Sequence, residues 1–243
     1  MILLLTGCIN PNGMAYTVLS DKEQRKKQYI KAIKFYLKNT TYPIVFTENS
    51  GTDISHHFTE NIQSGRMECF SFQGNLEKEL GKGYGECEIM EYAFNHSAII
   101  RKSKQQRIAK ITGRLVIKNI KTIVRWHTLL TSHRTTLCAI NSDLSFPDSR
   151  FVIASLEFYH IFLRRKAFIN DSAGYFFEHA LWDTIIEEKQ YPYSPFFIRP
   201  QIEGVSGSSG KPYTTETPSF QSTVRYARFG IHLWHLFQKK FRP

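Results

Sequence analysis

The segment "MILLLTGC" (residues 1–8) decides the fold, because it can be interpreted either as a buried strand or as an export signal. Its last four residues, Leu-Thr-Gly-Cys, have the apolar, small, small, Cys order of bacterial lipoprotein signals. However, no Lys or Arg precedes Cys8, and the apolar run covers only residues 2–5. A secretory signal needs a basic start and about 7 to 15 apolar residues. We therefore expect a buried strand over residues 2–5 in an unexported, cytoplasmic chain.

A helix and a second strand follow this segment. The stretch "SDKEQRKKQYIKAIKFYLKN" (20–39) predicts a helix, and Ser20 and Glu23 stand at capping-box spacing at its start. The stretch "YPIVFTENSG" (42–51) predicts a strand over residues 44–47 that ends in a polar turn. Strand, helix and strand in this order indicate a parallel βαβ unit.

The rest of the chain continues the alternation of strands and helices. The patterns predict strands at 67–72, 107–114, 135–141 and 149–155, and helices at 85–100, 157–168 and 173–189. The glycine- and serine-rich stretch 203–213 is expected to be a flexible loop, long enough to cover a site. We expect an α/β fold with one Rossmann-like domain over residues 1–215, in which helices flank a mostly parallel sheet. A C-terminal helical tail is expected over residues 216–243.

Composition limits the classes of protein and of partner. The chain has 243 residues, of which 42% are hydrophobic, so it can bury a sizeable core. It contains no apolar stretch near the roughly 20 residues of a membrane-spanning helix. None of the four cysteines forms a CxxC pair, which favours free thiols over a zinc or redox motif. The net charge of +11 indicates an anionic partner: nucleic acid, the phosphates of a nucleotide, or an acidic membrane surface.

The tail has two interpretations. Its sequence places Tyr226, Phe229, Leu233 and Phe237 on one helical stripe, and no acidic residue follows Glu216. A basic helix with an aromatic stripe is typical of peripheral contact with an anionic membrane. A terminal helix that packs on the core and keeps its basic side chains in solvent would show the same pattern.

Two motifs in the first half of the chain carry a resemblance. They are "GKGYGECEIMEYAF" (81–94) and "IAKITGRLVIKN" (108–119), together with "FTENSG" (46–51) and the opening "LLLTGCINP" (3–11). In this order they resemble small bacterial glycosyltransferases of surface-polysaccharide gene clusters, and more generally the nucleotide-sugar transferases of the GT-A fold. The resemblance implies a GT-A-like domain that moves a hexosyl or related sugar. The donor would be a nucleotide sugar and the acceptor a lipid-linked glycan at the cytoplasmic face of the inner membrane.

The resemblance also implies a donor site. In the family, the first strand and the turn after the second strand hold the nucleoside, a basic glycine loop opens a helix, and the next strand ends at the sugar diphosphate. The matching positions here are Thr6, Glu48, Asn49, Lys82, Glu86, Lys110, Thr112 and Arg114. Ordinary turn chemistry explains Glu48 and Asn49 equally well, and Lys82 taken alone could be a solvated surface lysine.

One departure from the family concerns the metal. Most GT-A enzymes have an Asp-x-Asp that binds a divalent metal where this chain has Thr112, Gly113 and Arg114. Arginine cannot bind Mg²⁺ or Mn²⁺, but its planar fork of donors can bind phosphate directly. The nearest acidic substitutes are Asp143 and Asp148. No cofactor is therefore assigned, and dependence on Mg²⁺ or Mn²⁺ stays open.

The candidate base for transfer lies in "INDSAGYFFEHALWD" (169–183). Inverting transfer needs a carboxylate that removes the proton of the acceptor hydroxyl. Position on a helix after the acceptor-binding loop favours Glu178, as the family pattern implies. Asp171 is the second candidate, although its place suggests a helix N-cap. His179 could assist, but a histidine on a helix is more often structural.

Two rival functions are weighed against the transferase. The basic charge and the aromatic residues of the tail would suit a non-enzymatic nucleic-acid-binding protein. No DNA- or RNA-binding motif occurs in the chain, so we expect no nucleic-acid partner. A nucleotidyltransferase would need a metal-binding carboxylate pair, which the sequence does not place clearly.

Overall fold

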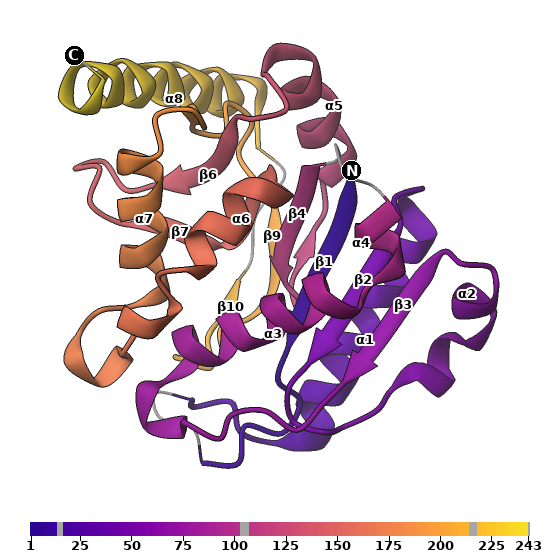
Figure 1. Cartoon of the computed structure of the whole chain (residues 1–243). Coiled ribbons are helices and arrows are strands. Elements are labelled where there is room, and N and C mark those ends of the chain that lie inside the picture. The colour runs from indigo at the N-terminus through magenta and orange to yellow at the C-terminus, as the bar shows by residue number, and fades with distance from the viewer. Residues whose placement is uncertain (14–16, 103–106, 214–217, 243) are drawn as a thin grey trace.

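A seven-stranded sheet forms the centre of the protein (Figure 1). The computed structural model describes residues 1–13, 17–102, 107–213 and 218–242. The strand order is β3-β2-β1-β4-β7-β6-β8, and only β7 runs against its two neighbours. The strands are β1 (Ile2–Gly7), β2 (Ile44–Glu48), β3 (Met67–Ser71), β4 (Arg107–Thr112), β6 (Thr136–Ile140), β7 (Pro147–Ser155) and β8 (Tyr193–Ser194). The expected α/β class with a mostly parallel sheet is confirmed.

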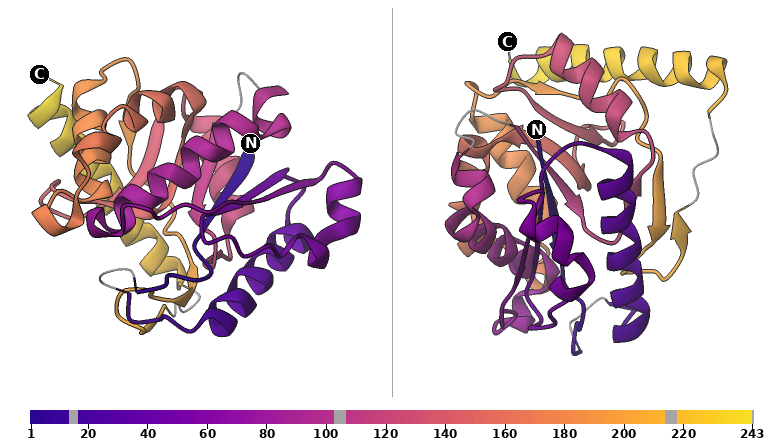
Figure 2. Two further views of the ribbon diagram at one scale, coloured as in Figure 1. Left: turned by 60° about the horizontal axis from the view of Figure 1, so that its bottom comes forward. Right: turned by 90° about the vertical axis from the view of Figure 1, so that its right-hand side faces the viewer.

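Helices cover both faces of the sheet. One face carries α1 (Lys22–Asn39) and α5 (Ile120–Leu130), and the other carries α3 (Lys82–His96), α6 (Leu156–Leu163) and α7 (Phe177–Glu187). Figure 2 shows α1 and α3 on opposite sides of the strands. Leu3 and Leu5 of β1 join the cluster under α1, whereas Ile2 and Leu4 join the cluster under α3. Because both faces are buried, this strand is a continuous apolar run.

A small second sheet replaces the predicted flexible loop. It contains β5 (Val116–Ile117), β9 (Ile202–Val205) and β10 (Pro212–Tyr213), and β9 pairs antiparallel with both other strands. The stretch 203–213 therefore includes a β-hairpin. Glu203 of β9 forms ion pairs with Lys31 of α1 at 3.3 Å and with Lys118 at 2.7 Å. These contacts attach the hairpin to the main domain.

Several predicted boundaries are wrong for local reasons. Asp21, not Ser20, caps α1, because its carboxylate accepts a hydrogen bond from the backbone of Gln24. The predicted helix 85–100 begins earlier, at Lys82, and is divided at Ser97 into α3 and α4 (Ala98–Lys102). A carboxylate from β3 causes this division, since Glu68 accepts hydrogen bonds from the first two amides of α4.

The predicted tail forms α8 (Phe220–Phe241), a single helix that packs on the domain. Leu233 and Phe237 are buried in the same cluster as Trp182 of α7, and the rings of Trp182 and Phe237 are 5.6 Å apart. A further short α-helix is α2 (Thr59–Gln63). In the described part of the chain, no helix is both long enough and apolar enough to cross a membrane.

Tyr36 connects α1 to the segment that follows β4, and this contact yields a stability prediction. Its buried hydroxyl donates to the Leu115 carbonyl and accepts from the Ile117 amide, each at 2.9 Å. Tyr36→Phe leaves both backbone groups without this partner, so we expect the free energy of unfolding to fall by about 1–3 kcal/mol in urea titrations. Tyr42→Phe, at a half-buried tyrosine, is the matched control. An equal loss in both variants would contradict the role of the hydroxyl.

Candidate functional site

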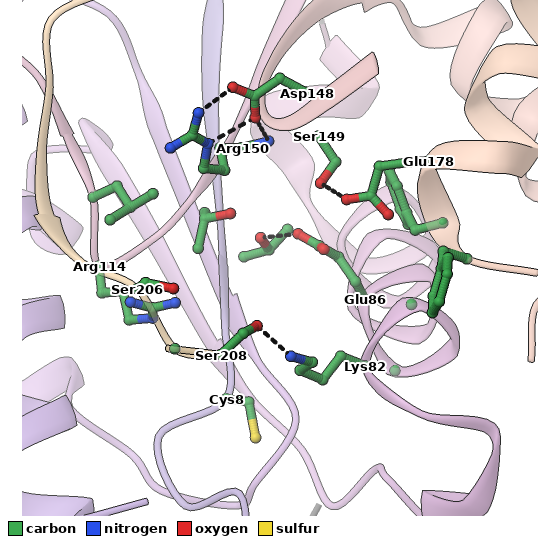
Figure 3. Close-up of a pocket in the computed structure, with 18 of the residues that line it drawn as sticks. Cys8, Lys82, Glu86, Arg114, Asp148, Ser149, Arg150, Glu178, Ser206 and Ser208 are labelled. Atoms are coloured by element: carbon green, nitrogen blue, oxygen red, sulfur yellow. Dashed lines mark hydrogen bonds and ion pairs between the residues drawn. The ribbon is translucent and has the colours of Figure 1, made fainter. Parts of the chain in front are cut away.

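A cavity of about 800 Å³ lies at the carboxyl ends of β1 and β4. From β1 the chain passes to β2 on one side, while β4 lies on the other side. In open α/β sheets, ligands bind in the crevice at such a switch in strand order. Thr6 and Gly7 from β1 and Thr112 and Arg114 from the end of β4 line the cavity. Figure 3 shows side chains from several elements converging on it.

Glu86 of α3 occupies the centre of the cavity. Its Oε1 accepts a hydrogen bond from the Thr6 hydroxyl at 2.8 Å and lies 2.5 Å from Nζ of Lys110. Lys110 is fully buried behind Glu86, where its ammonium also donates to the Ser149 carbonyl at 2.7 Å. Lys110 therefore does not line the cavity, and its expected direct contact with phosphate is replaced by a contact with Glu86.

Glu178 lies in the first turn of α7, with its carboxylate turned toward the cavity (Figure 3). The Ser149 hydroxyl donates to its Oε1 at 2.5 Å. Burial raises the pKa of Glu178, and the negative charge of Glu86 adds to this, whereas the bond from Ser149 acts against it. A carboxylate with a raised pKa is better suited to accept a proton near neutral pH than an ordinary glutamate.

Two cations flank the tip of the β9–β10 hairpin. Arg114 donates to the Val205 carbonyl, and Nζ of Lys82 lies 2.6 Å from the Ser208 hydroxyl (Figure 3). Burial lowers the pKa of both side chains, because it disfavours their charged forms. Within the described residues, no carboxylate forms an ion pair with Arg114. An anionic ligand at this place would stabilise the charge of this half-buried arginine.

Asp171 is not the N-cap of its own helix, as the sequence suggested, because α7 begins six residues later at Phe177. Its carboxylate instead accepts a hydrogen bond from the Gly83 amide of α3 at 3.3 Å. The side chain packs so closely on Gly81 that a Cβ there would lie 2.4 Å from the Asp171 Cβ. The glycines of "GKGYG" thus make room for a carboxylate at the start of α3, while the Lys82 side chain lines the cavity.

Glu48 and Asn49 have different surroundings. Glu48 does not line the cavity, and it accepts hydrogen bonds from the amides of Ser50 at 2.9 Å and Thr52 at 2.7 Å. It therefore organises the turn after β2. Asn49 does line the cavity, with its amide paired to that of Asn75 through bonds of 2.7 and 3.1 Å.

Asp143 and His179 also lie outside the cavity lining. Asp143 is exposed in a turn, where it accepts from the amide and hydroxyl of Ser145 at 3.0 and 2.6 Å. Nδ1 of His179 accepts from the Phe176 amide at 3.1 Å, so this ring caps the start of α7. Of the three proposed catalytic residues, the structure brings Glu178 and Asp171 to the cavity. The Asp171 carboxylate accepts from the amide of Gly83 in α3, whereas the Glu178 carboxylate accepts from the Ser149 hydroxyl.

The end of β4 does not fit a divalent metal. Its residues are Thr112, Gly113 and Arg114, and a guanidinium repels a cation where a metal site would need carboxylates. The nearby carboxylate of Asp148 is engaged by Arg150 through bonds to Nε at 2.8 Å and Nη2 at 2.5 Å. In the described residues, no group of three or more His, Cys, Asp or Glu side chains lies close enough together to hold a metal ion.

Several lining residues were missed from the sequence. Arg150 lies 4.6 Å from the ring centre of Tyr213, and both residues border the cavity with Ser149 and Ser208. Ser149 and Arg150 lie on β7, whose antiparallel placement beside β4 has no signal in the local sequence. Arg25, within α1, looks like a solvated helix residue but is buried, and its guanidinium donates to the Cys8 carbonyl.

The close contact of Gly81 with Asp171 gives a prediction with a matched control. Gly81 has φ +91° and Gly65 has φ +71°, so a side chain strains the backbone at both positions. Nothing lies within 4 Å of a Cβ at Gly65, whereas one at Gly81 would collide with Asp171. We expect Gly81→Ala to lower the midpoint of thermal unfolding more than Gly65→Ala. Equal shifts would mean that α3 does not need this close approach.

The raised pKa of Glu178 predicts a pH-dependent stability difference. Between the ordinary and the raised pKa, the unfolded chain has lost the proton that the folded chain keeps, so stability falls as pH rises through this window. The free energy of unfolding of the wild type, minus that of Glu178→Gln, should decrease from about pH 4 upward and become level once both states are ionised. Urea titrations across this range measure the difference. A difference that grows with pH would contradict the burial effect.

Comparisons with known proteins assign neither a family nor a function to the chain. A scan against models of protein families finds no match, and a search of curated proteins finds no similar sequence. Function is therefore inferred from the geometry and electrostatics of the cavity.

Proposed function

We propose that the chain is a glycosyltransferase that moves a sugar from a nucleotide-sugar donor to a glycan acceptor. One observation carries this proposal: the cavity has two half-buried cations, Arg114 and Lys82, at one end and the half-buried carboxylate of Glu178 at the other. Transfer from a nucleotide sugar requires both features, because a diphosphate must leave as an anion while an acceptor hydroxyl loses a proton.

The cationic end suits the diphosphate. The guanidinium of Arg114 can donate two parallel hydrogen bonds to phosphate oxygens, and the ammonium of Lys82 supplies a second positive charge. Both contact the hairpin tip, at Val205 and Ser208. Fixed positive charge at this place can stabilise the leaving group, so the proposed mechanism contains no step through a metal. The nucleoside would extend toward Asn49, Asn75 and Cys8, which line the same cavity.

The proposed reaction is a single displacement. Glu178 accepts the proton of the acceptor hydroxyl, the acceptor oxygen bonds to the anomeric carbon, and the bond from that carbon to the diphosphate oxygen breaks. The diphosphate keeps the electron pair and remains bound at Arg114 and Lys82. Glu86 lies between the two ends, where its carboxylate can accept hydrogen bonds from hydroxyls of the donor sugar. A single displacement inverts the configuration of the anomeric carbon.

A neighbouring cavity of about 430 Å³ provides room for the acceptor. It shares Asp148, Arg150 and Tyr213 with the main cavity and continues to α8, where Tyr226 and Gly230 line it. A glycan longer than one sugar can therefore extend from Glu178 past Arg150. As the family resemblance implies, we propose a lipid-linked glycan as the acceptor and the cytoplasmic face of the inner membrane as the location of the reaction.

Nucleotide binding and turnover test the proposal separately. The protein is screened by thermal shift against UDP, GDP, CMP, TDP and their sugars, with and without Mn²⁺, and turnover is followed as release of the nucleotide from the stabilising sugar nucleotide. We expect Arg114→Ala to weaken binding of the stabilising nucleotide at least about tenfold, because it removes a charged hydrogen-bond donor. Glu178→Gln should keep the binding and lose turnover by about 10²–10⁴-fold.

Arg101→Ala is the control for lost charge, because Arg101 is exposed on α4 and does not line the cavity. It should leave binding unchanged. If no nucleotide stabilises the fold while an oligonucleotide does, the nucleic-acid-binding alternative replaces the proposal. If Glu178→Gln turns over normally, the assigned base is wrong.

A further inference from the structure

The exposed apolar side chains of the protein are concentrated on two helices. Twelve large hydrophobic residues are exposed in the described part of the chain, and eight of them belong to α5 and α8. Those on α5 are Trp126, Leu129 and Leu130. Those on α8 are Phe220, Phe229, Ile231, Trp234 and Leu236. The exposed side chains of these two helices are called the α5–α8 surface below.

The two helices lie about a hundred residues apart in the sequence, but both contact Phe197. The ring of His127 on α5 stacks on Phe197 with centres 5.7 Å apart, and Gly230 on α8 packs against the same Phe197. Figure 1 shows α5 and α8 together at the top of the molecule, and the right view of Figure 2 agrees. The α5–α8 surface is therefore made by tertiary structure.

The charged side chains of this surface are all positive. Neither α5 nor α8 contains an aspartate or a glutamate. Their exposed cations are Lys121 and Arg125 on α5 and Arg225, Arg228, Lys239 and Lys240 on α8. An ordinary solvated helix carries both signs of charge and few large apolar side chains, so this composition calls for a partner.

The core does not use these apolar groups. On α8, Leu233 and Phe237 are buried against the domain, while Ile231 is 49% exposed. On α5, Ile123 and Val124 are buried, while Leu130 is 64% exposed. Each helix thus has an apolar inner face that satisfies the fold and further apolar groups that face solvent.

We infer that the α5–α8 surface binds the surface of a bilayer that contains anionic lipids. Apolar side chains interleaved with cations are suited to the boundary between acyl chains and headgroup phosphates. A second copy of the chain fits less well, since a symmetric contact would bring twelve cations together without a counter-charge. Nucleic acid fits less well because half of the eight apolar side chains are leucine or isoleucine, which do not stack on bases as the four aromatic residues could.

Vesicle co-sedimentation of the full chain tests the inference, and it does not depend on the proposed transferase activity. We expect binding to vesicles of equal parts phosphatidylglycerol and phosphatidylcholine, weaker binding to phosphatidylcholine alone, and a loss of binding with added salt. Arg228→Gln with Lys239→Gln should weaken partition to the anionic vesicles roughly 25-fold, at about fivefold for each charge. The control is Lys27→Gln with Lys34→Gln, which removes two exposed cations from α1 and should have little effect.

A second pair of double variants tests the contribution of the apolar side chains to vesicle binding. Leu130→Ser with Ile231→Ser should weaken vesicle binding at least about tenfold. Leu76→Ser with Phe168→Ser changes side chains that are 76% and 68% exposed elsewhere, and should leave binding unchanged. Circular dichroism confirms that each variant folds. Absence of vesicle binding, or equal losses in the two pairs, would overturn the inference. A dimer in light scattering that only the Leu130→Ser and Ile231→Ser changes disrupt would assign the surface to a second copy.

Discussion

The ion pair between the buried Lys110 and the cavity-lining Glu86 fixes the centre of this protein. Lys110 lies in the middle of β4 on the same side as Ile108, so strand alternation directs its ammonium into the core under α3. A buried ammonium without partners would be strongly unfavourable. Here Glu86 supplies the opposite charge, the Ser149 carbonyl accepts a hydrogen bond, and the face of the Phe177 ring lies 4.9 Å away.

These three partners come from three different elements, none of them β4 itself. The contacts that stabilise the Lys110 ammonium therefore fix the positions of α3, β7 and the start of α7 relative to β4. The same arrangement brings the Ser149 hydroxyl to Glu178 and directs Glu86 toward the Thr6 hydroxyl at the end of β1. A charge in the core thus specifies the geometry of the cavity, while its net contribution to stability can be small. The raised pKa of Glu178 belongs to the same network, because burial and the charge of Glu86 both act on it.

The other end of the cavity depends on a second long-range contact. Asp171 comes from the region before α7 and caps α3, which it can reach only because Gly81 and Gly83 have no side chains. Lys82 then turns to Ser208 on the hairpin tip, opposite Arg114. Glu203 attaches that hairpin to Lys31 of α1, so the cationic end combines α1, α3, β4 and the small sheet.

The local sequence determined most of the elements. Apolar runs identified β1, β2 and β4, because strands buried on both faces need uninterrupted apolar residues, and the first helix was located by its periodicity. The family resemblance, and not these patterns, pointed to Thr6, Lys82, Glu86, Arg114 and Glu178, all of which line the cavity. Local sequence patterns could not show that the Glu48 carboxylate binds the backbone amides of its own turn. An acidic residue in a turn gives the same sequence pattern whether it binds a ligand or the backbone.

Tertiary structure alone decided the rest. The antiparallel placement of β7, the hairpin at 203–213 and the capping of α3 by Asp171 depend on partners that lie far away in the sequence. The burial of Lys110 and Arg25, and the shared contact of α5 and α8 with Phe197, are equally invisible in a local window. Hydrophobic periodicity reports which side of an element is buried. It does not report which charge, glycine or carboxylate meets that side, because those contacts form only when the layers pack.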